Sequence, residues 1–373
     1  MIHNIPILFK VVLQDLIGNS MPVSDNLFHI NAAYLWLANA QDACNGCGGV
    51  SEGYHLLHGW LPPYPETTGY IIETFFDYFH LTGKDKVKSR AINMADWLIS
   101  IQNSDGSIMD SYFKKKMVFD TGQVIFGLIK AYEETSNEEY LAAAINAGDW
   151  LIRVQEEDGS WKKFAVNNIP HTYYTRVAWS LVRLYNATSE TKFLESALKN
   201  IRWAISRQEE NGWFNDASFT LTNHNKPFTH TIAYTMRGIL EVGLYTKEKH
   251  FVESVFKAVR NLVRVIQNDG FVSGTYDSTW RGDKSFCCLT GAAQLAIILF
   301  KVYLATNNEE YLIAAKNINK YLKTRQQLRL RDEQIYGAIP GSWPIWGKYI
   351  HFTYPNWAPK FFIDALIVEE TIK

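Results

Sequence analysis

The sequence predicts an all-helical toroid of six helical hairpins, on the strength of a sixfold repeat, two alternating classes of helix, and connections of alternating length. Six times along the chain, an aromatic or aliphatic residue is followed five positions later by Gln. The pairs are Trp36/Gln41, Trp97/Gln102, Trp150/Gln155, Trp203/Gln208, Leu262/Gln267 and Tyr321/Gln326. The steps between them are 61, 53, 53, 59 and 59 residues, so each repeat has room for two helices.

The helices that carry this repeat are expected to form the outer ring. Four of the six copies run into a turn that contains Asp-Gly or Asn-Gly, a pair that tolerates positive φ and so ends a helix. Residues 138–155 show the pattern of this class, because charged side chains occupy one face and apolar side chains the other.

A second series of helices lies between the repeats and is expected to form the inner ring. Five of its members share a Thr, at Thr68, Thr121, Thr172, Thr231 and Thr290, and a sixth starts near Asn356. These segments are small or apolar on nearly every face, which is typical of buried helices.

The connections alternate between short and long. Inner helices pass to outer helices through short segments such as 81–84 and 305–310, where Thr, Ser and Asn can serve as N-caps. The outer-to-inner segments are much longer, and in a ring they all lie at one end, where they can build a cleft. We expect residues 1–26 to be an N-terminal extension that packs on the toroid and residues 27–373 to form a single toroid domain.

Composition excludes several classes of protein. The chain is 47% apolar and 20% charged, which excludes a disordered chain, and its net charge of −1 without a long basic run argues against nucleic acid binding. The N-terminus lacks the basic region of a signal peptide, and no apolar run approaches the ~20 residues of a membrane span. Four cysteines do not suggest a disulfide scaffold, so the expected location is cytoplasmic.

No cofactor or metal is expected. No glycine-rich phosphate loop sits between a strand and a helix, because strands are not evident. Cys44 and Cys47, together with Cys287 and Cys288, could suggest zinc, but one Cys-x-x-Cys without a matching second pair is a weak signal.

The pattern resembles the (α/α)6 toroid of carbohydrate-active enzymes such as unsaturated glucuronyl hydrolases and N-acylglucosamine 2-epimerases. The phrase from Trp150 to Trp161 is similar to outer-helix phrases in those families and to the Gln/Trp repeats of terpene cyclases. The resemblance covers nearly the whole chain in architecture and implies carbohydrate processing. Class II terpene cyclases need an Asp-x-Asp-Asp motif, which this sequence lacks.

The candidate site is predicted at the starts of the inner helices. Alignment on the shared Thr places Thr67, Asp120, His171, His230 and Leu289 at equivalent positions, and three of these five side chains are ionisable. An Asp at a helix start can be only an N-cap, but the two histidines are not explained in that way.

Further candidates come from the same helix starts. Glu66 lies one residue before Thr67, between a proline and a glycine, and serves either in catalysis or in stabilising the helix dipole. Tyr70 and Gln123 follow in the first turns and are expected to bind substrate.

Two stripes of His, Tyr and Arg are expected to face the same hollow. His230, Tyr234 and Arg237 share one helical face, and His171, Tyr174 and Arg176 approach the same arrangement. Arg176 and Arg237 either form internal salt bridges or bind a substrate carboxylate.

Aromatic residues in the long loops are candidate sugar platforms, unless they serve only to pack the loops together. Those chosen as substrate ligands are Trp60, Trp161, Trp280 with Arg281, and Trp343.

The expected function is carboxylate-catalysed hydrolysis of an oligosaccharide or polysaccharide, of the kind that contains uronic acid, with Asp120 and Glu66 as the pair of acids. A second hypothesis is a uronate C5-epimerase or polysaccharide lyase, in which His or Tyr removes the proton and Arg holds the carboxylate. A third is a non-catalytic glycan-binding toroid, and a more remote fourth is a terpene-cyclase-like protein. The predicted partner is a glycan.

Overall fold

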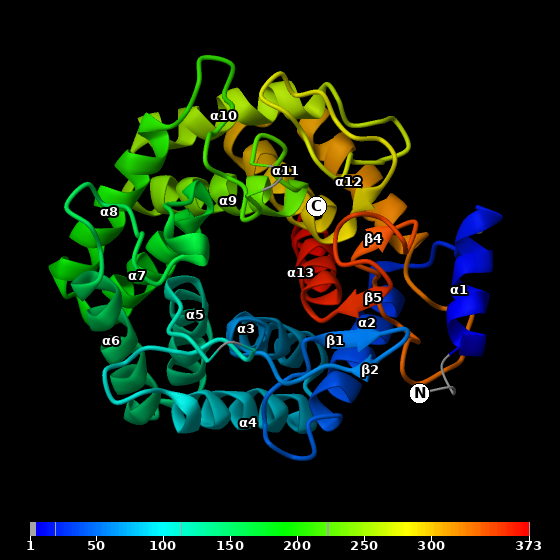
Figure 1. Ribbon diagram of the computed structural model, residues 1–373, viewed down its shortest axis with the longest axis horizontal. Coiled ribbons are helices and arrows are strands. Elements are labelled where there is room, and N and C mark those ends of the chain that lie inside the picture. The colour runs from blue at the N-terminus through cyan, green and yellow to red at the C-terminus, as the bar shows by residue number, and fades with distance from the viewer. Residues whose placement is uncertain (1–4, 19, 113, 222–223, 373) are drawn as a thin grey trace.

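The computed structural model describes residues 5–18, 20–112, 114–221 and 224–372 and is a ring of paired helices (Figure 1). The outer helices are α2 (Asn26–Asp42), α4 (Asp85–Ile101), α6 (Glu138–Arg153), α8 (Thr191–Ser206), α10 (Lys249–Val263) and α12 (Glu309–Lys323). The inner helices are α3 (Pro65–Thr82), α5 (Val118–Thr135), α7 (Thr175–Thr188), α9 (Thr229–Thr246), α11 (Leu289–Thr306) and α13 (Trp357–Thr371). The chain therefore has the predicted (α/α)6 toroid fold.

At five of its six positions, the repeated Gln joins one outer helix to the next. Gln155 donates its side-chain amide to the carbonyl of Gly159 in its own turn (2.9 Å) and to the carbonyl of Ser196 in α8 (3.1 Å). The same pair of bonds is made by Gln41, Gln102, Gln208 and Gln326. The repeat therefore encodes the contact between neighbouring hairpins as well as the end of each outer helix.

Glycines bring the inner helices close together. A Cβ on Gly127 in α5 would lie 2.2 Å from the carbonyl oxygen of Gly69 in α3, and one on Gly238 in α9 would lie 2.4 Å from the carbonyl oxygen of Thr175 in α7. A Cβ on Gly122 would likewise clash with Val177, and one on Gly291 would clash with Thr229. Each of these positions needs hydrogen in place of a side chain, because a neighbouring helix occupies the space.

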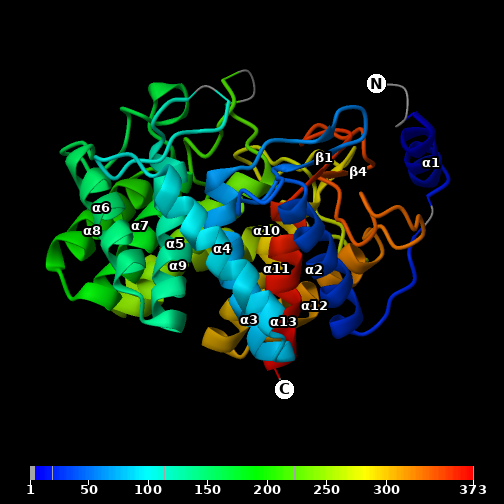
Figure 2. The same cartoon turned by 90° about the horizontal axis from the view of Figure 1, so that it is seen from below.

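The connections alternate as expected. Each inner-to-outer connection is two residues long and begins with a residue in the left-handed conformation, as at Gly83 (φ 67°) and Asn307 (φ 54°). The six outer-to-inner segments are long, and Figure 2 shows them gathered at one end of the ring. They also hold short strands that the sequence did not reveal.

Two small sheets order these loops. β1 (Gly53–His55) pairs antiparallel with β2 (Gly59–Trp60) and with β5 (Thr353–Pro355), so the last loop is joined to the first. β3 (Cys287–Cys288) pairs with β4 (Ser342–Trp343).

The N-terminal helix α1 (Ile5–Leu16) lies outside the ring, beside the last long loop (Figure 1). The Asp15 carboxylate accepts a hydrogen bond from the backbone N–H of Ile345 (2.6 Å), and Gln327 donates to the Gln14 side chain (3.0 Å). α2 begins at Asn26 with Asp25 as its N-cap.

One described helix, α11, is long and apolar enough to span a membrane by length and composition alone. Its 18 residues belong to the inner ring, and 72% of them are buried. This pattern is that of a core helix packed on all sides.

Candidate functional site

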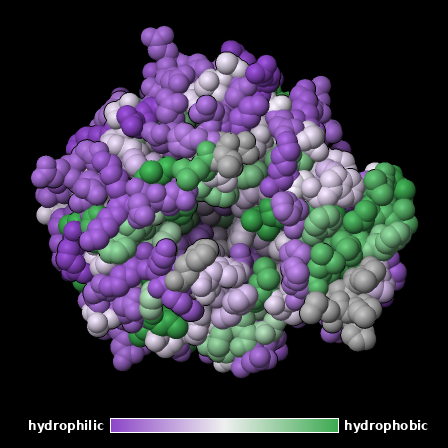
Figure 3. All heavy atoms as spheres, viewed as in Figure 1, coloured by the Kyte–Doolittle hydropathy of each residue, from purple (hydrophilic) through white to green (hydrophobic). Residues whose placement is uncertain are grey.

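A cavity of about 880 Å³ opens on the ring axis at the end of the long loops. Figure 3 shows the hollow at the centre of the ring. Its lining includes four of the candidate residues from the sequence, Glu66, Asp120, His230 and Tyr234. The starts of the inner helices therefore converge on one solvent-reachable space.

Glu66 and Asp120 occupy the first turns of two adjacent inner helices. Glu66 follows Pro65 at the start of α3, and Asp120 lies in the first turn of α5. The N-cap of α5 is Met117 and has no side-chain cap bond, so Asp120 is not an N-cap residue. The contact between Gly69 and Gly127 holds the two helices together and so brings the two first turns side by side.

The environment of these carboxyl groups favours their protonated forms. Asp120 is 3% exposed and its Oδ2 has no hydrogen-bond partner among the described residues. Burial, and then the negative charge of Glu66, raise the pKa of Asp120 well above its usual value. Burial also raises the pKa of Glu66 to about 7, with a smaller contribution from Glu52. The cavity thus holds two acids with raised pKa values close to one another.

A third acid, Glu52, was not expected from the sequence. It lies in the first long loop, lines the cavity and accepts a hydrogen bond from the hydroxyl of Tyr112. Burial raises the pKa of Glu52 to about 7. Glu52 follows Gly48 and Gly49 in the sequence. No sequence pattern in this region identified Glu52 as a site residue.

His230 is held in a neutral form. The side-chain amide of Gln294 in α11 donates to His230 Nδ1 (2.7 Å), which leaves the proton of the neutral ring on Nε2. Burial, and then the positive charge of Arg176, lower the pKa of His230 to about 3. The ring of Tyr234 lies 4.3 Å away.

Aromatic side chains form much of the wall, and the sequence did not identify them. The Trp357 indole donates to the hydroxyl of Tyr349 (2.9 Å), and the Tyr349 ring lies 5.4 Å from His230. The remaining aromatic lining residues are Tyr64, Tyr112, Phe119, Phe164, Tyr173 and Phe219. Several of these residues directly precede or follow the aligned helix starts. This proximity in the sequence could have identified them as lining residues.

His171 and Tyr174 do not line the cavity. His171 is 1% exposed, and its Nε2 lies 2.8 Å from the carbonyl oxygen of Val166. The hydroxyl of Tyr174 accepts a hydrogen bond from the backbone N–H of the same Val166 (3.0 Å). Both side chains therefore support the loop before α7, because the first turn of this hairpin is a 3₁₀ turn (Thr172–Tyr174) that offsets it from the others.

Tyr70, Gln123 and Arg176 lie beneath the cavity, in the packed centre of the ring. Arg176 donates from Nε to Gln123 Oε1 (2.6 Å) and lies 5.2 Å from the Tyr70 ring. None of the three lines the cavity. The expectation that Arg176 reaches substrate in this cavity does not fit this position.

Arg237 lies towards the opposite end of the ring. Its Nε donates to Glu241 (2.5 Å) one turn further along α9, so it forms an internal salt bridge. Residue 237 shares a helical face with His230, but seven residues of helix rise separate them by about 10 Å.

The tryptophans chosen as sugar platforms pack within their loops. Trp161 donates to the carbonyl of Leu151, Trp280 donates to the carbonyl of Asn211, and Trp60 packs on Trp36. The remaining two residues of this group have other partners. The Arg325 guanidinium lies over the Trp343 ring, and Arg281 forms an ion pair with Asp277. None of the five lines the cavity.

The four cysteines form two separate pairs in the fold. Cys44 and Cys47 follow α2, whereas Cys287 and Cys288 form β3 and are buried. Among the described residues, no group of three or more His, Cys, Asp or Glu side chains is arranged to hold a metal.

Comparisons with known proteins agree with this architecture. The family model described as the squalene-hopene cyclase C-terminal domain matches residues 56–240, a stretch that carries three of the six repeats. Comparison with curated proteins finds no match.

Solved structures match over nearly the whole chain. An unsaturated glucuronyl hydrolase specific for heparin has a TM-score of 0.73 at 16% identity, covering 92% of this chain and 96% of that one. The cellobiose 2-epimerase from Bacillus thermoamylovorans has a TM-score of 0.70 at 13% identity, covering 98% and 100%. A sugar epimerase from a ruminal bacterium has a TM-score of 0.72 at 12% identity, with the same coverage. These similarities establish the (α/α)6 toroid fold.

Proposed function

We propose that this protein is a carbohydrate-active enzyme that hydrolyses a glycosidic bond, with Asp120 and Glu66 as its two catalytic carboxyl groups. The observation that carries the proposal is the placement of both acids in the first turns of adjacent inner helices, on one open cavity. The similarity in fold to glucuronyl hydrolases and sugar epimerases supports a carbohydrate substrate.

The two carboxyl groups suit different roles. Hydrolysis needs one protonated carboxyl as the acid and one ionised carboxyl as the base or nucleophile. The pKa of Asp120 is raised well above its usual value, so Asp120 keeps its proton and acts as the acid. The pKa of Glu66, at about 7, leaves it partly ionised near neutral pH, so it serves as the partner.

The aromatic wall fits a sugar. Phe119, Tyr173 and Trp357 present ring surfaces to the cavity, and the apolar C–H faces of pyranose rings stack on such surfaces. The part of the lining that is charged consists of four acids, Glu52, Glu66, Asp110 and Asp120, and two cations, Lys115 and Lys116. Lys116 pairs with Asp105 (2.5 Å), and no arginine is among the lining residues, so a uronate held by arginine is not part of this proposal.

A second candidate is epimerisation of a neutral sugar. Tyr234 favours it, because this residue lines the same cavity beside the neutral ring of His230. Two of the solved structures of similar fold are named as epimerases.

The test incubates purified protein with a panel of neutral and acidic oligosaccharides. Hydrolysis produces new reducing ends, whereas epimerisation in D2O incorporates deuterium without cleavage. We expect Asp120→Asn and Glu66→Gln each to abolish release of reducing ends while binding of the oligosaccharide is retained. Asp85→Asn is the matched control, because Asp85 lies in the first turn of an outer helix, away from the cavity.

Three outcomes would contradict hydrolysis. Unchanged turnover in both variants would remove the two acids from the mechanism. Deuterium exchange without cleavage would replace hydrolysis by epimerisation. Binding of a glycan with neither reaction, across the panel, would indicate a binding protein.

All four cysteines are free, which is compatible with the cytoplasmic location proposed for this enzyme.

A further inference from the structure

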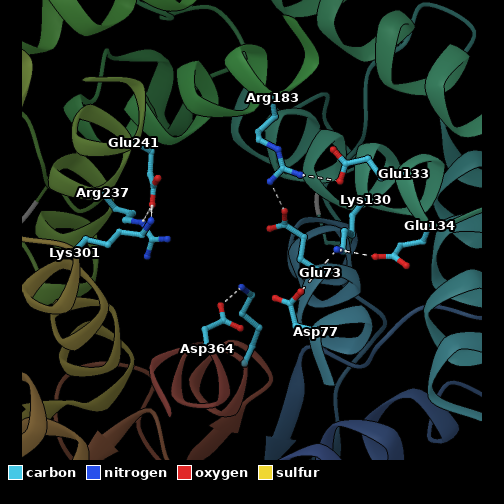
Figure 4. A network of polar contacts seen from close by, with 11 residues as sticks. Glu73, Asp77, Lys130, Glu133, Glu134, Arg183, Arg237, Glu241, Lys301 and Asp364 are labelled. Carbon is cyan, nitrogen blue, oxygen red and sulfur yellow. Dashed lines mark hydrogen bonds and ion pairs between the residues drawn. The ribbon is translucent and has the colours of Figure 1, made fainter. Parts of the chain in front are cut away.

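A second cavity of about 250 Å³ lies on the ring axis near the short connections, at the end opposite the candidate active site. It is lined by residues of the inner helices, and Figure 4 shows charged side chains arranged around it. The lining cations are Lys130, Arg176, Arg183, Arg237 and Lys360, and the lining acids are Glu73, Asp77 and Asp364.

On one side of this cavity, carboxylates outnumber their cations. Arg183 pairs with both Glu73 (2.8 Å) and Glu133 (3.4 Å). Lys130 pairs in the same way with Glu134 (2.8 Å) and Asp77 (3.8 Å). The side formed by α3 and α5 is therefore the negative side of the cavity.

On the α9 and α11 side, cations outnumber carboxylates. Arg237 and Lys301 share the single carboxylate of Glu241, at 2.5 Å and 2.9 Å. Figure 4 shows these three side chains together, separated from the acidic side by the open centre. One positive charge on this side is left without a carboxylate of its own.

Arg176 adds a second positive charge beside it, and the carboxylate that its charge influences is Glu66, whose pKa it lowers. The Arg176 side chain is 2% exposed, and only its Nε makes a hydrogen bond, to the neutral amide of Gln123. Its two terminal nitrogens donate to no described residue, and no described carboxylate forms an ion pair with it. Arg176 and Arg237 lie against the same ring, 5.3 Å and 5.1 Å from the centroid of Trp179.

A buried guanidinium that forms no ion pair is less stable than one in direct contact with a negative group. Aromatic rings offset part of this, and five of them surround Arg176. The unused nitrogens are the ones that bind planar or tetrahedral oxyanions in a forked geometry.

We propose that the cavity between Arg176 and Arg237 is a binding site for a small oxyanion, either a phosphate or a carboxylate. The rings of Tyr70 and Tyr234 lie 5.2 Å and 4.9 Å from the Arg176 guanidinium, and the two cavities share no lining residue. The anion site can be tested without any activity assay.

The experiment titrates the wild-type protein by calorimetry with inorganic phosphate and, separately, with succinate. We expect saturable binding of at least one of the two, and the stronger binder identifies the source of the oxyanion. Arg176→Gln keeps a polar side chain but removes the charge, and we expect it to weaken binding at least tenfold. Arg207→Gln is the matched control, because Arg207 pairs with Asp216 at the surface, and we expect unchanged affinity.

Absence of saturable binding of both anions to the wild type would overturn the proposal, as would equal affinity in a folded Arg176→Gln protein. If circular dichroism shows that Arg176→Gln does not fold, Arg237→Gln takes its place, because Lys301 remains to pair with Glu241. Crystals of the wild type soaked in arsenate locate the anion by its anomalous signal. Arsenate between Arg176 and Arg237 supports the proposal, and arsenate bound only elsewhere contradicts it.

Discussion

Gln326, at the end of the last outer helix, donates its side-chain amide to the backbone carbonyl of His29 in the first outer helix, at 3.1 Å. Its Oε1 also lies 2.6 Å from His29 Nδ1, and its amide reaches the carbonyl of Gly337 in its own turn (2.9 Å). The bond that joins successive hairpins elsewhere in the chain thus closes the ring here, between residues 297 positions apart.

Replacing Gln326 should weaken the contact between the last and the first outer helix. We expect Gln326→Ala to lower the free energy of unfolding by about 2–4 kcal/mol, because two buried carbonyl groups lose their donor. Urea denaturation followed by circular dichroism measures the change. Gln267→Ala is the control within the same repeat, because the exposed Gln267 side chain makes no hydrogen bond to a described residue, and we expect a change within about 0.5 kcal/mol. Equal losses in the two variants would contradict this account of the repeat.

The close approach of α3 and α5 should be equally sensitive. We expect Gly127→Ala to destabilise the protein by about 1–3 kcal/mol, because the new Cβ would lie 2.2 Å from the carbonyl oxygen of Gly69. Gly243→Ala in α9 meets only atoms at 3.0 Å or beyond, the nearest of them on side chains, and gains helix propensity, so its effect should be smaller. Thermal denaturation of the two variants compares them, and a more stable Gly127→Ala protein would show that this contact is not tight.

Glu66 should make stability depend on pH. Its pKa is raised from 4.5 to about 7, so between these values the folded protein keeps a proton that the unfolded chain releases. The free energy of unfolding therefore falls as the pH rises from about 4.5 to about 7, and it does not recover above that range. Glu66→Gln cannot ionise and should escape this loss.

We therefore expect the stability of Glu66→Gln relative to wild type to be greater at pH 8 than at pH 4, as measured by urea denaturation at both values. Glu157→Gln, in an exposed turn, supplies the background. A stability difference between Glu66→Gln and wild type that stays constant with pH would show that Glu66 titrates alike in both states.

His230 should stay neutral near physiological pH. Its pKa is lowered to about 3, so we expect no protonation of this ring between pH 5 and pH 9. Nitrogen-15 NMR of labelled histidines measures it, with His230→Asn identifying the signal and the tautomer protonated on Nε2. A His230 signal that titrates between pH 5 and pH 7 would make the imidazole, rather than Glu66, a candidate for the titrating catalytic group.

The ring of helices, and the end of it that carries the long loops, could be predicted from the sequence because both depend on local, periodic features. The Gln repeat and the Asp-Gly turns fix where outer helices end, and the shared Thr marks the inner helices. The alternation of short and long connections then places all long loops at one end. Glu66, Asp120, His230 and Tyr234 follow from this, because a residue at the start of an inner helix must face the long-loop end.

The rest of the site was decided by tertiary packing. Arg237 lies on the same face of α9 as His230, but the two residues lie at different heights along the helix axis. Glu241 also neutralises the charge of Arg237. His171 is drawn to the carbonyl of Val166 by a 3₁₀ turn that no repeat announces. The loop tryptophans fill gaps whose shape depends on neighbouring loops, whereas Tyr349 and Trp357 reach the cavity from the far end of the chain. Sequence periodicity determined which end of each helix faces the cavity. Only the close packing of loops and helices distant in sequence decided which side chains line it, because that choice depends on volume and hydrogen-bond partners supplied by other hairpins.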